Sequence, residues 1–230
     1  MRQWDHLFAD AYWDSLFTGC GWDDLFADEK KYALVEPHPV VVRTISRLRA
    51  AGVRAVLDLG CGAGRHLVLL GKEGFCAWGC DKSPRGLLLS RRKLAQSSGS
   101  GRLVAADFRA LPFVDQCFDA VVSIHVLYHA YRVGMQKALD EARRVLKPGG
   151  LFVGTLISTR TWKYGRGRWV EDDTFVQLEG AEPGIAHHYS DERDVMDLLS
   201  GFTIENLAHD ESRTMDNRID CHWEVIAARR

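Results

Sequence analysis

The sequence has no long apolar run, since no stretch approaches the roughly 20 residues of a membrane-spanning helix. Its first residues, MRQWDHLFAD, have neither the basic head nor the apolar middle of a secretory signal peptide. It also has no excess of one charge, because 30 Lys and Arg against 31 Asp and Glu give a net charge of −1 at pH 7. We therefore expect a cytoplasmic protein with no membrane partner and no nucleic-acid partner.

Disulfide and metal motifs are missing as well. The six cysteines include no C-x-x-C pair, and in a cytoplasmic chain we interpret them as reduced core thiols. No low-complexity linker divides the 230 residues, which favours one domain, as a monomer or a homodimer.

What is present, from residue 53 onward, is a regular alternation of apolar strand-like and amphipathic helix-like segments. This alternation predicts right-handed crossovers and a parallel sheet. Two late strands, 202–211 and 220–229, have no helix between them, so we expect antiparallel neighbours at the edge of the sheet. The other expected strands are 53–60, 75–80, 102–107, 118–124 and 150–158. The expected helices are 4–16, 37–52, 65–74, 83–96, 135–146 and 191–200. The predicted fold class is α/β: a Rossmann-like, doubly wound, mostly parallel seven-stranded sheet with an antiparallel edge strand and helices on both faces.

The segment VLDLGCGAGRHLVLL, residues 56–70, places three glycines at an expected strand-to-helix turn, where doubly wound sheets bind ligands. The spacing departs from the dinucleotide pattern G-x-G-x-x-G, because position 65 is Arg. Asp58 would also repel a pyrophosphate at close range. A cationic ligand without phosphate, such as S-adenosylmethionine, fits better. The alternative is a glycine turn kept only for close packing of strand and helix.

Four blocks in this order resemble one family: LDLGCGAG, GCDKSP, AADFRALPFVDQCFDAVVSIHVLYH and EARRVLKPGGLFV. The stretch from about Val53 to Thr155 is similar to the class I, seven-stranded methyltransferases that use S-adenosylmethionine. Within them it resembles the type 11 small-molecule group around the ubiquinone-biosynthesis and tellurite-resistance enzymes. The resemblance implies S-adenosylmethionine as cofactor and S-adenosylhomocysteine as product.

The resemblance also suggests cofactor-binding residues. Asp81 ends the second strand, where a carboxylate can accept from both ribose hydroxyls, although it could instead be an exposed helix cap. Asp107 would accept from the adenine amino group, and Phe108 would lie along the ring or be ordinary core. The full predicted set is Tyr12, Trp13, Asp58, Gly60, Cys61, Gly62, Gly64, Asp81, Lys82, Asp107, Phe108, Ser123 and Ile124. Arg144 and Lys147 are interpreted as surface charges facing water.

Candidate catalytic residues follow the fourth strand and end the long insertion. His125 and His129 are four residues apart, so they could share a helical face. Two histidines without a carboxylate make a weak metal site, so none is predicted. We expect His125, His129 and His188 as catalytic candidates, although His129 could be a solvated turn residue. The substrate candidates are Tyr128, Tyr164, His187 and Tyr189.

Four regions are expected within the single domain, 1–230. Residues 1–52 form a helical lid, in which the aromatic side chains either cover the cofactor or merely pack on the sheet, namely Trp4, Phe8, Tyr12 and Trp13. Residues 53–157 form the cofactor-binding core. Residues 158–189 form a substrate lid, interpreted as a β-hairpin, and residues 190–230 the last helix and edge strands.

The predicted function is transfer of a methyl group to a small acceptor, such as a thiol or another soft nucleophile. Two alternatives remain open. A tRNA wobble-uridine methyltransferase shares a similar LPF…FDAVVS block, and a non-catalytic module could keep the cofactor fold alone.

Overall fold

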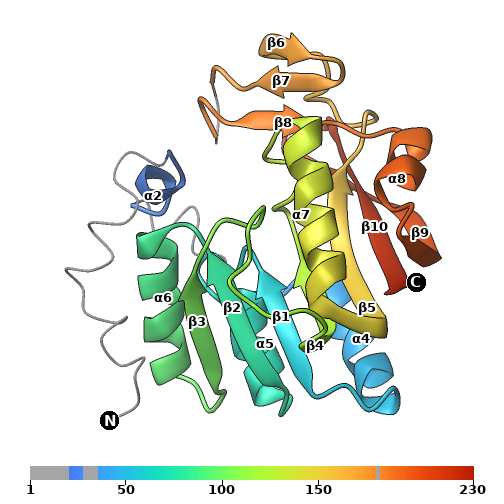
Figure 1. The fold of residues 1–230 in the computed structure, drawn as a ribbon. Helices are drawn as coiled ribbons and strands as arrows, with labels where there is room; N and C mark the ends of the chain where they lie inside the picture. The colour runs from blue at the N-terminus through green and yellow to red at the C-terminus, as the bar shows by residue number, and fades with distance from the viewer. Residues whose placement is uncertain (1–20, 28–35, 180–181) are drawn as a thin grey trace.

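The computed structural model describes residues 21–27, 36–179 and 182–230, and the rest of the chain is drawn as a grey trace in Figure 1. Trp4, Phe8, Tyr12 and Trp13, predicted to cover the cofactor, lie outside the described residues, as does the expected helix 4–16.

A seven-stranded sheet forms the centre of the molecule, in the order β3-β2-β1-β4-β5-β10-β9 (Figure 1). The first five strands are parallel, whereas β10 runs antiparallel to both β5 and β9. The predicted α/β fold with an antiparallel edge is therefore confirmed. The strands are β1 (Ala55–Leu59), β2 (Cys76–Asp81), β3 (Gly101–Ala105), β4 (Phe118–Ser123), β5 (Leu146–Ile157), β9 (Phe202–Arg213) and β10 (Ile219–Arg229).

Helices cover both faces because successive strand residues point to opposite sides. In β1, Val56 belongs to one buried cluster and Leu57 to the other. The cluster containing Val56 packs against the side chains of α4 (Pro39–Ala50), α5 (Arg65–Lys72) and α6 (Pro84–Ala95). The cluster containing Leu57 packs against α7 (Arg132–Val145) and α8 (Glu192–Leu198). A short helix, α2 (Gly21–Leu25), lies near α6 (Figure 1).

The segment between β5 and α8 forms a small sheet of its own. Its strands β6 (Arg168–Glu171), β7 (Thr174–Val176) and β8 (Ala186–His188) are antiparallel, in that order. The expected hairpin is thus present as β6 and β7, and β8 extends it to three strands. The small sheet stands at one end of the main sheet, beyond the start of α7 (Figure 1).

Arg144, near the end of α7, corrects one expectation. Its guanidinium does not simply face water: it donates to Glu141 at 2.7 Å, Asp115 at 2.8 Å and the Phe113 carbonyl at 2.7 Å. These bonds fasten the 111–115 loop to α7.

Within the described ranges, each helix is too short or too polar to cross a bilayer.

Candidate functional site

A cavity of about 190 Å³ opens at the carboxyl ends of β1, β2 and β4. This is where a parallel sheet of this winding binds its ligand. Nine of the predicted site residues line it: Gly60, Cys61, Gly62, Asp81, Lys82, Phe108, Ile124, His125 and His129. The remaining lining residues are Trp22, Phe26, Leu59, Ala63, Arg65, His66, Cys80, Ala106, Val126 and Glu182.

The glycine loop after β1 requires residues without a side chain at two points. Gly60 has φ +74°, and a Cβ there would lie 2.4 Å from the Val126 side chain. Gly62 has φ +48°, and a Cβ there would lie 2.9 Å from the Phe26 ring. The loop therefore needs glycine at both positions, because the backbone is left-handed and neighbouring side chains leave no room for a Cβ. Gly64, at the N-terminus of α5, packs under Ser90 and does not line the cavity.

Asp81 holds the glycine loop from the end of β2. Its carboxylate accepts from Gly62 N at 2.7 Å and from Ser83 N at 2.8 Å. Burial raises the pKa of Asp81, and these amide bonds oppose the rise. Ser83, rather than Asp81, caps α6, since its hydroxyl accepts from Gly86 N at 3.0 Å. A carboxylate has about four acceptor positions, so Asp81 keeps capacity toward the cavity.

Asp58 lies beneath the loop instead of lining the cavity, which corrects its expected place. It is 1% exposed, and its Oδ2 atom has no hydrogen-bond partner. Burial raises the pKa of Asp58 to about 7. Its neighbour is His66, with Nδ1 3.9 Å from Asp58 Oδ1. Asp58 is therefore shielded from the cavity by the loop above it.

Two further cofactor candidates also lie off the cavity. Asp107 is engaged by Arg109, which donates to its two oxygens at 2.8 and 2.6 Å. Ser123 is fully buried and donates to the Leu59 carbonyl at 3.0 Å, so it joins β4 to β1. The residues after them, Phe108 and Ile124, do line the cavity.

His125 stands in a turn, so the helical face expected for His125 and His129 does not form. His125 has φ +58°, and its backbone N–H donates to Thr155 Oγ1 at 2.8 Å. Burial lowers the pKa of His125 well below its ordinary value. Tyr128 lies behind it, with Oη 3.2 Å from His125 Nδ1 and 3.3 Å from His222 Nε2.

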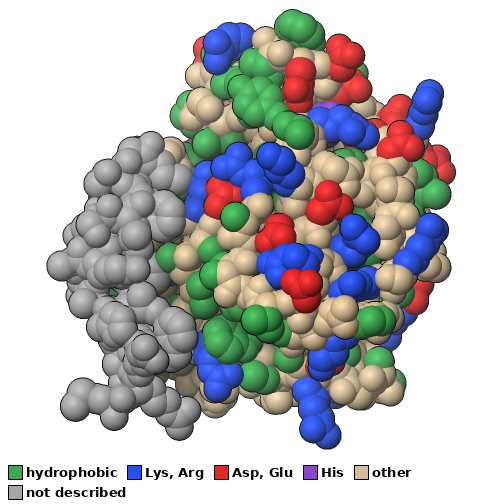
Figure 2. Space-filling view, in the orientation of Figure 1, with side chains coloured by type: hydrophobic (Ala, Val, Ile, Leu, Met, Phe, Trp, Pro, Cys, Tyr) green, Lys and Arg blue, Asp and Glu red, His purple; other side chains and the backbone are tan. Residues whose placement is uncertain are grey.

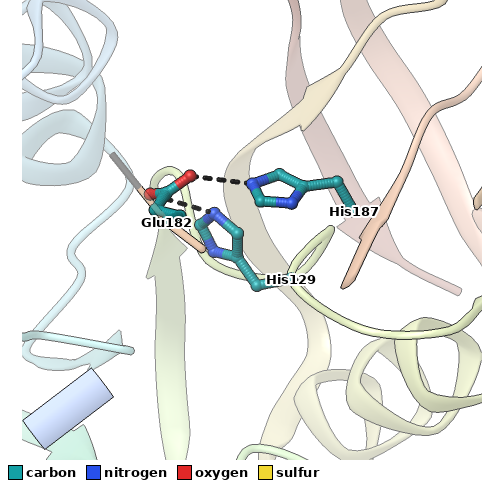
Figure 3. Close-up of side chains that lie close together, drawn as sticks. All are labelled: His129, Glu182 and His187. Carbon is teal, nitrogen blue, oxygen red and sulfur yellow. Dashed lines mark hydrogen bonds and ion pairs between the residues drawn. The ribbon is translucent and has the colours of Figure 1, made fainter. Parts of the chain in front are cut away.

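Figure 3 shows three side chains that converge beside the cavity: His129, Glu182 and His187. His187 Nε2 lies 2.8 Å from Glu182 Oε2, and His129 Nε2 lies 3.5 Å from Glu182 Oε1. The His129 side chain is 5% exposed, so it is not the solvated turn residue considered above. Burial lowers the pKa of His129 to about 4, and the ring is neutral at pH 7. His187 does not itself line the cavity.

The other candidates from the insertion point elsewhere. His188 lies between Thr174 Oγ1 at 2.7 Å and Asp194 Oδ2 at 3.0 Å, which places it away from the cavity. Tyr164 donates to Asp173 at 2.5 Å, and Tyr189 is fully buried beside it. These contacts hold the small sheet together.

The segment of residues 21–27 contributes Trp22 and Phe26 to the cavity wall. The Trp22 ring lies 4.6 Å from the His129 ring, and Phe26 packs on Gly62 and Gly86. Asp23 fastens this segment, because it accepts from Ser83 Oγ and Arg85 N, both at 2.8 Å. The aromatic residues predicted to cover the cofactor precede this segment in the chain, and neither Trp22 nor Phe26 was among them.

Three further residues at or near the cavity were not among the predicted site residues. Arg65 follows the glycine loop directly and was noted only for breaking the dinucleotide pattern. Glu182 lies in a segment without periodicity, so no local signal identified it. His222 lies on β10 and approaches His125 only through the fold, at 4.5 Å between rings.

Residues 56–150 match the family described as "Methyltransferase domain". The same part is 36% identical over 99 residues to demethylmenaquinone methyltransferase from Tropheryma whipplei (strain Twist), which covers 43% of this chain and 39% of that protein. It is 35% identical over 99 residues to sterol 4-C-methyltransferase from Caenorhabditis elegans, covering 42% of this chain and 29% of that protein. The chain thus spans less than half the length of these curated relatives.

Solved structures share the fold. A Methanosarcina mazei protein described as a SAM-dependent methyltransferase superposes with TM-score 0.70 at 20% identity, covering 84% of this chain and 98% of that one. Magnesium protoporphyrin IX methyltransferase from Synechocystis, solved with bound SAM, superposes with TM-score 0.64 at 16% identity, covering 96% and 97%. Residues 56–150, less than half of the chain, thus match the methyltransferase domain family, and the chain has the class I, seven-stranded methyltransferase fold.

Proposed function

We propose that the chain is an S-adenosylmethionine-dependent methyltransferase that acts on a small molecule with a soft nucleophile, such as a thiol. The observation that carries this proposal is the left-handed glycine loop, held by Asp81, at the edge of a cavity at the carboxyl ends of the strands. The family match and the cofactor-bound structural relatives agree with it.

The residues present suit this cofactor. S-adenosylmethionine supplies a methyl group on a positively charged sulfur, together with an ammonium and a ribose. Asp81 has acceptor capacity left for hydroxyl donors at the cavity wall. Phe108 and Ile124 provide apolar walls. S-adenosylmethionine has no phosphate, so the loop needs no cationic side chain to bind one.

The histidines at the cavity wall are not strong bases. His125 and His129 are both neutral at pH 7, because burial lowers their pKa values. An amine or alcohol would need to lose its proton to a stronger base. A thiol has a pKa of about 8.5, well below that of an alcohol, so it needs the least help from these weakly basic side chains to lose its proton.

The surface gives little support to the tRNA alternative. On the face shown in Figure 2, Lys and Arg side chains are interspersed with Asp and Glu. Phosphate-backbone binding requires clustered positive charge. The non-catalytic alternative is disfavoured by a cavity that keeps both the loop and its acid.

A turnover assay tests the proposal. The full chain is incubated with S-adenosylmethionine and panels of thiols, alcohols, amines and tRNA, and S-adenosylhomocysteine is measured. We expect product with thiols, and lower cofactor affinity for Asp81→Ala by about 1–3 kcal/mol in calorimetry. Turnover with tRNA and with none of the small molecules would favour the tRNA methyltransferase over the proposed thiol acceptor. Cofactor binding without any turnover would favour a non-catalytic module. Unchanged affinity in a folded Asp81→Ala variant would contradict the cofactor site.

A further inference from the structure

We propose that His129, Glu182 and His187 bind a divalent transition-metal ion, Zn²⁺ in the first instance, at the wall of the cavity. Their ligand atoms all lie within 4.8 Å of one another, and the three side chains point toward a common centre (Figure 3). Two imidazoles and one carboxylate form a ligand set that zinc adopts when it keeps one position open.

The protonation pattern at His187 is the first argument. His187 Nδ1 lies 3.1 Å from the Ile185 carbonyl oxygen, which can only accept, so Nδ1 carries the proton. Nε2, the nitrogen left for a ligand, points at Glu182 Oε2, 2.8 Å away. A proton or a metal ion between these two atoms satisfies both of them. A backbone carbonyl that orients the non-ligating nitrogen is also the usual support of a metal-binding histidine.

His129 supplies the second argument. Its Nε2 is buried and has no hydrogen-bond partner, although it lies 3.5 Å from Glu182 Oε1. Buried polar atoms nearly always have a partner. Ligand atoms about 2.0–2.1 Å from a tetrahedral zinc are about 3.3 Å apart. The two histidine nitrogens lie 2.8 and 3.5 Å from the two Glu182 oxygens, so the carboxylate brings both within reach of one ion.

The surroundings leave room for an exogenous ligand. Glu182 and His129 line the cavity, while His187 closes the rear of the cluster at 1% exposure. The open coordination position therefore faces the cavity.

A second cluster, His38, Asp210 and Glu224, is less suitable. There His38 Nδ1 already accepts from Val40 N at 3.3 Å, and Glu224 pairs with Arg43.

This inference deepens the proposed function and rests on it for one consequence. A thiol that enters the cavity can coordinate the ion as a thiolate and release its proton to solvent water. Bound zinc lowers the pKa of its ligands strongly, which supplies the activation that the neutral histidines do not.

The test uses the full chain, stripped with a chelator and titrated with Zn²⁺ alone against a chromogenic competitor. We expect one tightly bound ion per chain, and a visible absorption band of tetrahedral geometry with Co²⁺. Glu182→Gln and His187→Gln should each weaken Zn²⁺ binding by about 100-fold or more, since loss of a group that only orients a ligand already costs about 10–100-fold. His188→Gln is the matched control, a neighbouring buried histidine with its own carboxylate, and should bind as the parent does. Cys76→Ser removes adventitious binding by an exposed thiol.

Cofactor affinity, measured by calorimetry on the same samples, reports folding and separates the two proposals. His187→Gln, which lies behind the cavity, supports the metal site when it keeps normal cofactor affinity and loses Zn²⁺ binding. Absence of stoichiometric Zn²⁺ from a chain that binds cofactor, or equal Zn²⁺ affinity in parent and Glu182→Gln, would overturn it and leave an imidazolium–glutamate pair. Zn²⁺ binding without any cofactor binding would reject the methyltransferase proposal alone.

Discussion

Two features of the structure require glycine at position 62. Its backbone is left-handed, and a Cβ there would lie 2.9 Å from the Phe26 ring. We predict that Gly62→Val weakens S-adenosylmethionine binding beyond detection in calorimetry while the sheet remains folded, as judged by circular dichroism. The strain of the left-handed conformation costs about 1–2 kcal/mol, and the clash adds to it.

Gly74→Val provides the control for this change. Gly74 has φ +87°, but a Cβ there would meet nothing within 4 Å, and the residue lies away from the cavity. The variant should lose comparable stability and keep cofactor affinity. Equal loss of binding in both variants would mean that strain, rather than the site, is responsible.

His66 makes stability depend on pH. Burial lowers the pKa of His66 to about 3, helped by the charges of Arg65 and His38. Its Nε2 accepts from His38 N at 3.1 Å, which requires the neutral ring. Below about pH 6.5 the unfolded chain binds a proton that the folded chain refuses, so stability falls as the pH falls toward 3. Asp58, with its pKa raised to about 7, contributes in the opposite direction between about pH 4 and 7.

We therefore predict that parent and His66→Gln differ in the slope of unfolding free energy against pH. From pH 7 to pH 5 the parent should lose about 2 kcal/mol more than the variant, at about 1.4 kcal/mol per pH unit below pH 6.5. Urea unfolding of parent and His66→Gln at pH 7 and pH 5 measures this difference in unfolding free energy. Parallel curves would show that His66 is protonated in the folded state.

At the scale of elements, α2 is fastened to the start of α6 through one carboxylate. Asp23 accepts from Ser83 Oγ and Arg85 N, and this contact brings Trp22 and Phe26 over the cavity. We predict that Asp23→Ala weakens cofactor binding by about 1 kcal/mol, the net value of a hydrogen bond, and speeds amide exchange in residues 21–27.

The neighbouring Asp24 is exposed on the same helix, so Asp24→Ala is the matched control and should change neither quantity. Cofactor should also slow exchange of residues 21–27 in the parent. Identical exchange with and without cofactor would mean that the segment packs on the sheet without acting as a lid.

At the scale of the whole molecule, Asp194 connects the small sheet to the core. It lies on α8 and pairs with His188 of β8 at 3.0 Å and Arg132 of α7 at 2.7 Å. Burial opposes ionisation, but the bonds from His188 and Arg132 prevail and lower the pKa of Asp194 to about 2. The stability from this pairing is present above about pH 4 and is lost as the pH falls toward 2.

We predict that Asp194→Asn lowers the unfolding free energy at pH 7 by about 2 kcal/mol, and that the difference disappears near pH 2. Asp197→Ala, an exposed change on the same helix, should have no measurable effect. Chemical unfolding at pH 7 compares the variants. Equal stability of parent and Asp194→Asn would show that the apolar contacts of β8 suffice to hold the small sheet.

The sequence alone determined the α/β class, the strand order along the chain and the position of the glycine loop with Asp81. These features are local: strand and helix periods, a turn that needs glycine, and an acid at a strand end follow from neighbouring residues. Nine predicted site residues line the cavity for the same reason, because the carboxyl ends of parallel strands meet at one edge.

Only the tertiary structure decided which side chains from distant segments meet. Asp58 and Asp107 follow strands as expected, yet one is buried beneath the loop and the other is turned to Arg109. Glu182 reaches His129 because β8 pairs with the turn after β4, through His188 N and the Tyr128 carbonyl at 2.9 Å. Such contacts depend on the register of elements far apart in the chain, and side-chain patterns within one segment carry no information about that register.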